Sequence, residues 1–321
     1  MINEARLRQE LAQTMDTTDF PGLGDKTTGK VRDSYRADGR LILITTDRIS
    51  AFDRVLGTIP FKGQVLNQMA DFWFNATRDL VPNHVLTVPD PNVMVVRECR
   101  QLALEFVVRN YLTGVTKTSL WYNYERGVRE YCGHKLPERL RKDQRLERPI
   151  LTPTTKFEKH DRPVSREQAI AEKLIEPELF DAAAEICMRL FDFGVRHALQ
   201  RGLILVDTKY ELGLCDGQLL ISDEIHTPDS SRYWFADSYD ELFSAGADQR
   251  KIDKEYVREW FVQQGFRGDG VPPAMPDDVR LEAARRYINA YELISGREFS
   301  ATDQAPQQRI ENNLRQAGLL S

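Results

Sequence analysis

Apolar residues recur along the chain at two spacings, one typical of strands and one typical of helices. Short runs rich in β-branched and aromatic residues predict strands at Val31–Tyr35, Leu41–Thr46, Val93–Arg97 and Leu102–Arg109. The turn Ala37-Asp38-Gly39 between the first two runs predicts a hairpin. The first hundred or so residues are therefore expected to form a mainly β unit with one or two helices.

Helical spacing appears near the start of the chain and dominates its second half. Apolar residues at this spacing predict helices at Ile2–Met15, Val65–Leu80, Asp253–Gln264 and Asp277–Ser295. Residues Ser165–Gln200 predict a pair of helices divided at Pro177. The residues after Ser295 read as a polar tail.

The region between these two halves differs from them in composition. Residues Lys135–Pro149 are rich in charge and proline, and Thr152–Pro163 is polar with two prolines, so loops and irregular pieces are expected. A strong hairpin signal follows, with strands at Gly202–Gly213 and Gln218–Ile225. Because the strands come in hairpins and do not alternate with helices, the predicted fold class is α+β with largely antiparallel sheets.

This second hairpin places charged residues in otherwise apolar strands. A three-residue loop at Cys215-Asp216-Gly217 would set Lys209 opposite Asp223, with Glu211 diagonal to it on the same face. Two carboxylates and a lysine would then project together and suit a magnesium-nucleotide site. A two-residue loop would instead shift the register and move Asp223 to the other face.

Composition and charge narrow the class of protein. The 321 residues suffice for one large or two ordinary domains, and the net charge of −5 argues against broad nucleic-acid binding. The chain shows neither a signal peptide nor an apolar run long enough to span a bilayer. Its four cysteines are spread out without a CxxC pair, which is typical of reduced cytosolic thiols. A cytoplasmic enzyme with small-molecule partners, and with neither nucleic acid nor membrane, is expected; its oligomeric state is left open.

Two short motif matches are rejected. Residues 24–31 nearly satisfy the P-loop pattern, but Val31 lacks the required hydroxyl and a strand is predicted to follow in place of a helix. Asp192-Phe193-Gly194 spells a kinase magnesium motif but lies within helical spacing, so Phe193 is expected to be a core residue.

Four other segments carry candidate chemistry. The turn at Gly29–Asp33 combines a glycine with a lysine and could bind an anion, and the loop Thr45–Asp53 gathers carboxylates, an arginine and a serine. Glu105 and Arg109 are charges inside an apolar strand, which requires either a mutual ion pair or a ligand. Thr227–Trp234 offers hydroxyls and an arginine suited to phosphate. Solvated loops are the alternative for the first two segments, and a structural ion pair is the alternative for Glu105 and Arg109.

In chain order, several of these segments and others between them resemble the motifs of the SAICAR synthase family: GKVRD, TDRISAFD, IPFKG, EFVVRNYLTG, LTPTTKFEKHD, LVDTKYELG and SDEIHTPDSSRYW. The resemblance runs from about Gly29 to Trp234 and is closest to the longer form of the enzyme. It implies an ATP-dependent ligase of purine biosynthesis that phosphorylates an imidazole carboxylate and lets the amine of L-aspartate displace the phosphate. The implied cofactors are ATP and Mg2+.

The resemblance also implies roles for individual residues. For the nucleotide, Lys30 and Arg32 would contact the ATP phosphates, Lys209 would reach the transferring phosphoryl group, and backbone near Leu102, followed by Glu105, would meet the adenine side. Glu211 and Asp223 would hold magnesium. The other expected substrate contacts are Ser50 and Asp53 (the latter directly or through a second metal), Arg109 and Arg232 at the ribonucleotide phosphate, and Lys156, His160 and Asp161 on an active-site loop.

The chain departs from the family pattern at one position. Many relatives have serine directly after the glycine of the YLTG segment, whereas this chain has Val115. Either Thr116 or Ser119 replaces that serine at the substrate phosphate, or the two arginines hold the phosphate alone.

The family fold implies two lobes with an ATP-grasp-like or kinase-like nucleotide cleft between them. We expect a smaller β-rich lobe at residues 1–108 and a larger α+β lobe at 109–321. Two other functions are weighed: a kinase-like phosphotransferase acting on another small molecule, and a nucleotide-binding regulatory protein without catalysis. The first would use ATP without needing aspartate, and the second would tolerate loss of Lys209 and Glu211.

Overall fold

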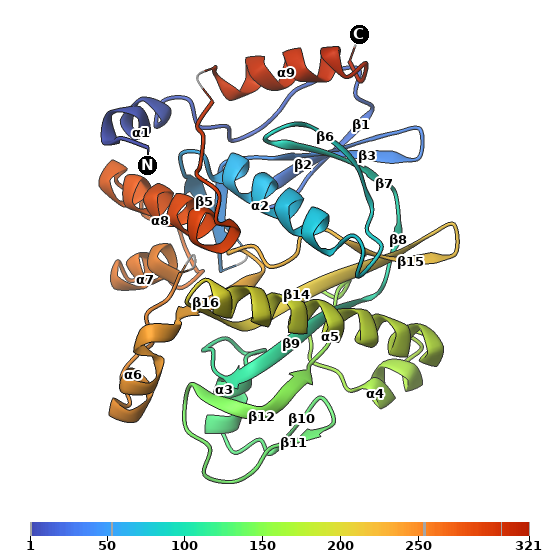
Figure 1. Cartoon of the computed structure of the whole chain (residues 1–321), viewed down its shortest axis with the longest axis vertical. Coiled ribbons are helices and arrows are strands. Elements are labelled where there is room, and N and C mark those ends of the chain that lie inside the picture. The colour runs from blue at the N-terminus through green and yellow to red at the C-terminus, as the bar shows by residue number, and fades with distance from the viewer. Residues whose placement is uncertain (1, 53, 253–254, 303, 321) are drawn as a thin grey trace.

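The computed structural model describes residues 2–52, 54–252, 255–302 and 304–320, and it consists of helices gathered around two antiparallel sheets (Figure 1). The smaller sheet has the strand order β1-β2-β3-β7-β6. The larger, seven-stranded sheet runs β12-β9-β14-β15, with β13 paired to β9 and with β8 and β16 paired to β14. No described helix is both long enough and apolar enough to cross a membrane.

The strands of the smaller sheet are β1 (Asp25–Thr28), β2 (Arg32–Ala37), β3 (Arg40–Thr45), β6 (Val85–Asp90) and β7 (Val93–Arg97). The larger sheet contains β8 (Arg100–Gln101), β9 (Leu104–Leu112), β12 (Gln144–Leu151), β13 (Thr154–Thr155), β14 (Leu203–Cys215), β15 (Gln218–Ser222) and β16 (Ser231–Phe235). Two separate hairpins are formed by β4 (Arg48–Ala51) with β5 (Arg54–Thr58) and by β10 (Glu130–Tyr131) with β11 (His134–Lys135).

The helices are α1 (Glu4–Glu10), α2 (Lys62–Thr77), α3 (Leu120–Glu125), α4 (Arg166–Ala171), α5 (Pro177–Gln200), α6 (Tyr239–Ala245), α7 (Glu255–Gln263), α8 (Asp277–Ser295) and α9 (Pro306–Gln316). The predicted helices correspond to α1, α2, the pair α4 and α5, α7, and α8. Of these α8 has the predicted ends, whereas α1 is shorter than predicted because Asn3 caps its start and a turn begins at Leu11.

The C-terminal tail contains a helix that the polar composition hid. In α9 only one apolar stripe, with Ile310 and Leu314, is buried, and it packs with core residues of the smaller sheet. Arg309 fixes the helix further by donating to Asp90 at the end of β6, with Nε 3.0 Å from Oδ2. The prediction of a plain polar tail was therefore wrong, because two apolar residues one turn apart suffice when the rest of the helix faces solvent.

The charged, proline-containing segment before residue 150 also forms regular structure. We expected irregular chain there, but β12 pairs antiparallel with β9, and its register shifts between Arg145 and Ile150. The break in register accommodates Pro149, since an edge strand with a bulge tolerates a residue that lacks an amide donor.

The two rejected motifs behave as the sequence predicted. Residues 24–31 lead from β1 into β2, so no helix follows the glycine-rich segment as a P-loop would require. Phe193 lies within α5 and packs against the main hydrophobic core.

The larger sheet has one apolar and one charged face, and this division positions the site. Phe106 and Val108 of β9 and Tyr210 and Leu212 of β14 are buried in the same core cluster as α5. Phe106 contacts Phe180 of that helix, with ring centroids 5.6 Å apart. Because side chains alternate between faces along a strand, the intervening residues of β9 and β14 project from the opposite face.

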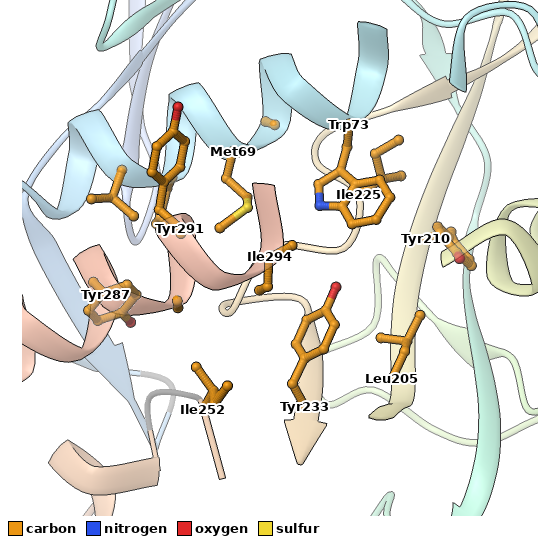
Figure 2. Packing of buried hydrophobic residues seen from close by; sticks show 14 of the residues in the cluster. Met69, Trp73, Leu205, Tyr210, Ile225, Tyr233, Ile252, Tyr287, Tyr291 and Ile294 are labelled. Atoms are coloured by element: carbon orange, nitrogen blue, oxygen red, sulfur yellow. The ribbon is translucent and has the colours of Figure 1, made fainter. Parts of the chain in front are cut away.

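The helices α2 and α8 join the two sheets through one continuous core. Figure 2 shows Met69 and Trp73 of α2 directed toward α8 and Tyr233 of β16, Ile294 of α8 beside Tyr233, and Tyr291 of α8 directed toward α2. All of these side chains are nearly inaccessible to solvent. The C-terminal helices are therefore integral to the fold, although they follow the strands that carry most of the chemistry.

Candidate active site

A row of charged side chains lines one face of the three central strands of the larger sheet. Asp207 of β14 pairs directly with Arg109 of β9 and with Arg232 of β16. Lys209, two residues further along β14, pairs with Val107 and shares the face of Asp207. With Glu105 of β9 and Glu211 of β14, the row contains six charged side chains, which the pairing of three strands brings together.

The two arginines predicted to hold a phosphate share one carboxylate. Asp207 accepts from Arg232, whose Nε lies 2.8 Å from Oδ1, and from Arg109, whose Nη1 lies 3.3 Å from Oδ2. Arg109 is further fixed by hydrogen bonds from Nε to the Thr152 hydroxyl at 2.8 Å and from Nη2 to the Thr118 carbonyl at 3.0 Å. Both guanidinium groups are thus held in place before any ligand arrives.

A cavity of about 360 Å3 opens over this row. Its walls include both arginines, Lys209, and the segment after β9 that carries Gly114, Thr116 and Ser119. The hydroxyls of Thr116 and Ser119 lie 2.7 Å apart and hydrogen bond to each other, whereas Val115 is 64% exposed. Both hydroxyls that could replace the missing serine therefore line the same wall as the arginines.

Gly114 is required at this wall for two reasons. Its φ of +94° is unfavourable for residues with a side chain, and an added Cβ would lie 2.5 Å from the Ser119 hydroxyl and 2.6 Å from Nη1 of Arg232. The absence of a side chain is what allows the backbone to approach the arginine so closely.

We expect Gly114→Ala to destabilise the fold and also to displace Arg232, raising the KM of the phosphate-bearing substrate predicted to bind there roughly tenfold, as loss of about 1.4 kcal/mol of binding would. Gly127→Ala is the matched control, because Gly127 has a φ of +90° with nothing within 4 Å of an added Cβ. Urea unfolding and steady-state kinetics on both variants separate backbone strain, about 1–3 kcal/mol, from the steric effect. Equal losses of stability with unchanged KM values would contradict this interpretation of Gly114.

Lys209 lies between the cavity and a second group of charges. Its Nζ donates to Glu105 Oε1 at 2.8 Å and to Glu211 Oε1 at 2.6 Å, and Lys156 forms an ion pair with the other oxygen of Glu211. Burial alone would lower the pKa of Lys209, but Glu211 and Glu105 outweigh it and raise that pKa, so the amine stays protonated. Burial would likewise raise the pKa of Glu211, yet Lys209 and Lys156 hold it well below its usual range.

The hairpin has the register of the two-residue loop and not that of the three-residue loop. Cys215 pairs with Gln218, so the loop has only two residues, Asp216 and Gly217, both with positive φ as a type I′ turn requires. Glu211 consequently pairs with Ser222, and the predicted pairing of Lys209 with Asp223 was wrong.

Asp223 nevertheless lies close to the cluster. The strand β15 ends at Ser222, and Asp223 adopts a left-handed conformation with φ 62°, which takes it out of the ladder. Arg32 forms ion pairs with Asp223 and with Glu224, the latter at 3.0 Å. Asp223 also contributes to the raised pKa of Lys209, so the two groups interact electrostatically across the site.

Arg48, from the loop Thr45–Asp53, holds the turn that carries Lys30. Arg48 donates to the carbonyl oxygens of Lys30 and Gly29 at 3.2 and 3.0 Å, and its Nη2 lies 2.7 Å from Asp33. Lys30 itself is exposed. Arg48 therefore positions this turn and is not directed at a ligand.

Leu102 lies where the chain passes from one sheet to the other. Its amide donates to the carbonyl of Leu212 at 2.9 Å, and its side chain is 3% exposed. An adenine ring at this linker would consequently meet other backbone groups than the Leu102 amide.

Several predicted substrate residues are not brought to the cavity wall. Ser50 lies half-buried in β4, and His160 and Asp161 are exposed on the loop after β13. Asp53 falls outside the described residues, although its neighbour Phe52 lies 5.3 Å beneath the guanidinium of Arg258, which does line the cavity. Within the described ranges, no group of three or more histidine, cysteine or acidic side chains is arranged to hold a metal ion.

Sequence analysis missed two carboxylates that the structure places at the site. Asp207 holds both arginines, and Asp229 also lines the cavity. The signal for Asp207 was available, since it is a charge within an apolar strand, the same criterion that identified Glu105 and Arg109. Asp229 gave no such signal because its partners lie in α2 and α8.

Comparison with known proteins connects this geometry to one family. Residues 25–273 match the sequence model described as SAICAR synthetase. A phosphoribosylaminoimidazole-succinocarboxamide synthase of Legionella pneumophila (strain Lens) is 50% identical over 278 residues, covering 86% of this chain and 89% of that protein. The chloroplastic enzyme of the same name from Arabidopsis thaliana is 47% identical over 311 residues, covering 96% and 76%.

Solved structures of SAICAR synthases have the same fold as this chain. The SAICAR synthase of Saccharomyces cerevisiae complexed with SAICAR superposes with a TM-score of 0.78 at 30% identity, covering 90% of this chain and all of that one. A type-2 SAICAR synthetase in complex with ADP shares the fold, with a TM-score of 0.65 at 24% identity over 86% of this chain and all of the other. The predicted α+β, ATP-grasp-like fold is confirmed, and the chain belongs to the SAICAR synthetase family.

Proposed function

We propose that this protein is an ATP-dependent ligase of purine biosynthesis. It joins L-aspartate to the carboxylate of 5-amino-1-(5-phosphoribosyl)imidazole-4-carboxylate and yields SAICAR, ADP and phosphate. The observation that carries the proposal is the position of Lys209, between a cavity walled by two arginines and a cluster of carboxylates and cations. The relatives that share the family do not favour the alternative of a kinase-like phosphotransferase.

The cavity side suits the ribonucleotide. Arg109 and Arg232, fixed by Asp207, offer N–H donors to a phosphate, and Thr116 and Ser119 add hydroxyls on the same wall. Rigid donors of this kind bind a phosphate without paying for reorganisation when the substrate arrives.

The cluster side suits the nucleotide. Arg32 and Lys30 would contact the ATP phosphates, with adenine near Leu102 and Glu105. For magnesium, Glu211 and Asp223 supply carboxylate oxygens, the donors that this ion prefers. Two carboxylates are enough, because Mg2+ bound with a nucleotide takes its remaining ligands from phosphates and water. The residues therefore fit the ion, which when bound would offset the negative charge of the phosphates.

The reaction needs a carboxylate to become a better electrophile. Phosphorylation of the imidazole carboxylate by ATP forms an acyl phosphate, and attack by the aspartate amine then forms the amide bond and releases phosphate. The protonated Lys209 would stabilise the charge that develops on the transferring phosphoryl group. Lys156, which shares Glu211 with Lys209, is available to take part from the loop after β13.

An isotope experiment tests the acyl phosphate. With substrate labelled by 18O in its imidazole carboxylate, one labelled oxygen should appear in the released phosphate, because that oxygen leaves with the phosphoryl group. Mass spectrometry of the phosphate measures it. Phosphate without the label, alongside normal amide formation, would contradict the proposed sequence of steps.

The division into lobes at residues 108 and 109, and the cytoplasmic location, stay predictions. Residue 108 lies within β9, and both α8 and α9 pack against the N-terminal part of the chain.

A further inference from the structure

Asp229 is a cavity-lining carboxylate for which the proposed chemistry so far has no use. It lies in the turn between β15 and β16 and contributes to the wall of the cavity alongside Ser230 and Arg232. Its two oxygens are engaged by residues from distant parts of the chain. Lys62 Nζ lies 2.9 Å from Oδ2, and the Tyr287 hydroxyl donates to Oδ1 at 2.6 Å.

Both partners of Asp229 are buried. Lys62 is 0% exposed, Tyr287 is 4% exposed, and the Asp229 side chain is 6% exposed. Lys62 also lies over the ring of Tyr287, with Nζ 5.3 Å from the centroid. A fully buried lysine is costly unless it is paired, so this pairing fixes the carboxylate strongly.

The backbone around Lys62 is built to present it. Lys62 is the first residue of α2, and the preceding Phe61 has a left-handed conformation with φ 61°. The amide of Gly63 donates to Asp47 Oδ1 at 2.9 Å, which anchors the first turn of the helix. A strained residue before a buried cation is the kind of arrangement that persists when the surroundings overdetermine it.

Tyr287 lies far along the chain from both Lys62 and Asp229. It lies on α8, one turn before Tyr291, and both project from that helix into the packed interior (Figure 2). Residue 287 is beyond the segment 25–273 that matches the family model. Through this hydroxyl α8 supports Asp229 in the wall of the active-site cavity.

We propose that Lys62 and Tyr287 are positioning residues that hold the Asp229 carboxylate in the cavity, where it accepts a hydrogen bond from an N–H group of a substrate. The inference rests on the proposed function, because it assumes that amine-bearing substrates enter this cavity. Each carboxylate oxygen can accept more than one hydrogen bond, and Asp229 lines the cavity that the substrates would enter. Two substrates carry such a group: the ribonucleotide, on its ring, and L-aspartate, whose amine is the nucleophile.

The test compares Tyr287→Phe with Tyr291→Phe in the full-length protein. Both remove one hydroxyl from a buried tyrosine of α8, but only Tyr287 donates to Asp229. We expect Tyr287→Phe to raise the KM of one amine-bearing substrate roughly three- to tenfold, the usual effect of one lost hydrogen bond, and to leave the KM of ATP unchanged. The substrate whose KM rises identifies the source of the N–H group. Tyr291→Phe should leave all three KM values at the wild-type level.

A second variant keeps the test decisive if Tyr287→Phe proves unstable. Asp229→Asn preserves the shape of the side chain and should raise the same KM by a larger factor than Tyr287→Phe does. The inference is overturned if Tyr287→Phe and Tyr291→Phe behave alike, if all three KM values rise together, or if Asp229→Asn binds both amine-bearing substrates normally. Wild-type turnover is measured first; if it does not require both of these substrates, the proposed function fails and not the positioning role.

Discussion

Replacing Lys209 by methionine is expected to lower kcat by roughly 100- to 1,000-fold, the usual loss when one preorganised donor at a developing charge is removed. Methionine keeps the length of the aliphatic part of the side chain but removes the cation that contacts Glu105 and Glu211 and faces the cavity. Glu211 would keep Lys156 as a partner, so the fold is expected to survive. Steady-state kinetics with circular dichroism and thermal unfolding measure both effects.

Lys135→Met is the control for this experiment, because Lys135 is an exposed lysine of β11 and does not line the cavity. It should leave kcat and the unfolding temperature unchanged. A folded Lys209→Met protein that retains more than about a tenth of wild-type kcat, far above the loss expected for such a donor, would remove Lys209 from the catalytic role.

Replacing Arg232 by alanine is expected to raise the ribonucleotide KM by roughly 10- to 100-fold and to change the KM of ATP little. A hydrogen bond to a charged group is worth about 1.5–3 kcal/mol, which corresponds to this range. Asp207 would retain Arg109 as its partner, so no buried carboxylate is left alone. The difference between the two KM values is what assigns Arg232 to the phosphate.

Arg250→Ala provides the comparison for Arg232. Arg250 is 54% exposed, pairs with Asp237 and lies over the ring of Phe235, outside the cavity. Its loss should leave both KM values at the wild-type level. Equal increases in the KM of ribonucleotide and of ATP in Arg232→Ala would discredit the phosphate clamp.

The sequence predicts the local patterns well wherever one strand or helix suffices to explain them. Asp207, Lys209 and Glu211 occupy every second position of an apolar strand. The sequence therefore predicts that Lys209 and Glu211 share one face, as the structure shows. The strand at Val93–Arg97 and the helix at Asp277–Ser295 have the predicted ends. In each case the signal is the periodicity of side-chain burial, which the sequence carries directly.

What the sequence could not fix is which distant segments meet. The hairpin was misjudged because a one-residue difference in loop length shifts the register, and Asp223 then joins the cluster only through a left-handed backbone conformation. The contacts of Asp229 join residues 167 and 58 positions apart, and no local pattern reports such pairs. Asp207, in contrast, could have been found, had the rule for charges in apolar strands been applied to every strand.

In the loop after β13, the sequence does not predict which residues face the site. Lys156 forms an ion pair with Glu211, whereas His160 and Asp161 lie exposed. Their assignment came from a motif that covers the whole loop, and a motif does not distinguish residues that face the site from those that face solvent. Their substrate roles stay predictions.

The most direct test of the proposed ligase is phosphate release from MgATP and the carboxyaminoimidazole ribonucleotide, measured with and without L-aspartate. The proposal predicts sustained turnover only when all three substrates are present, with the succinocarboxamide product identified by mass. Phosphate release at the same rate without aspartate would contradict it and would favour a phosphotransferase acting at the same cluster of charges.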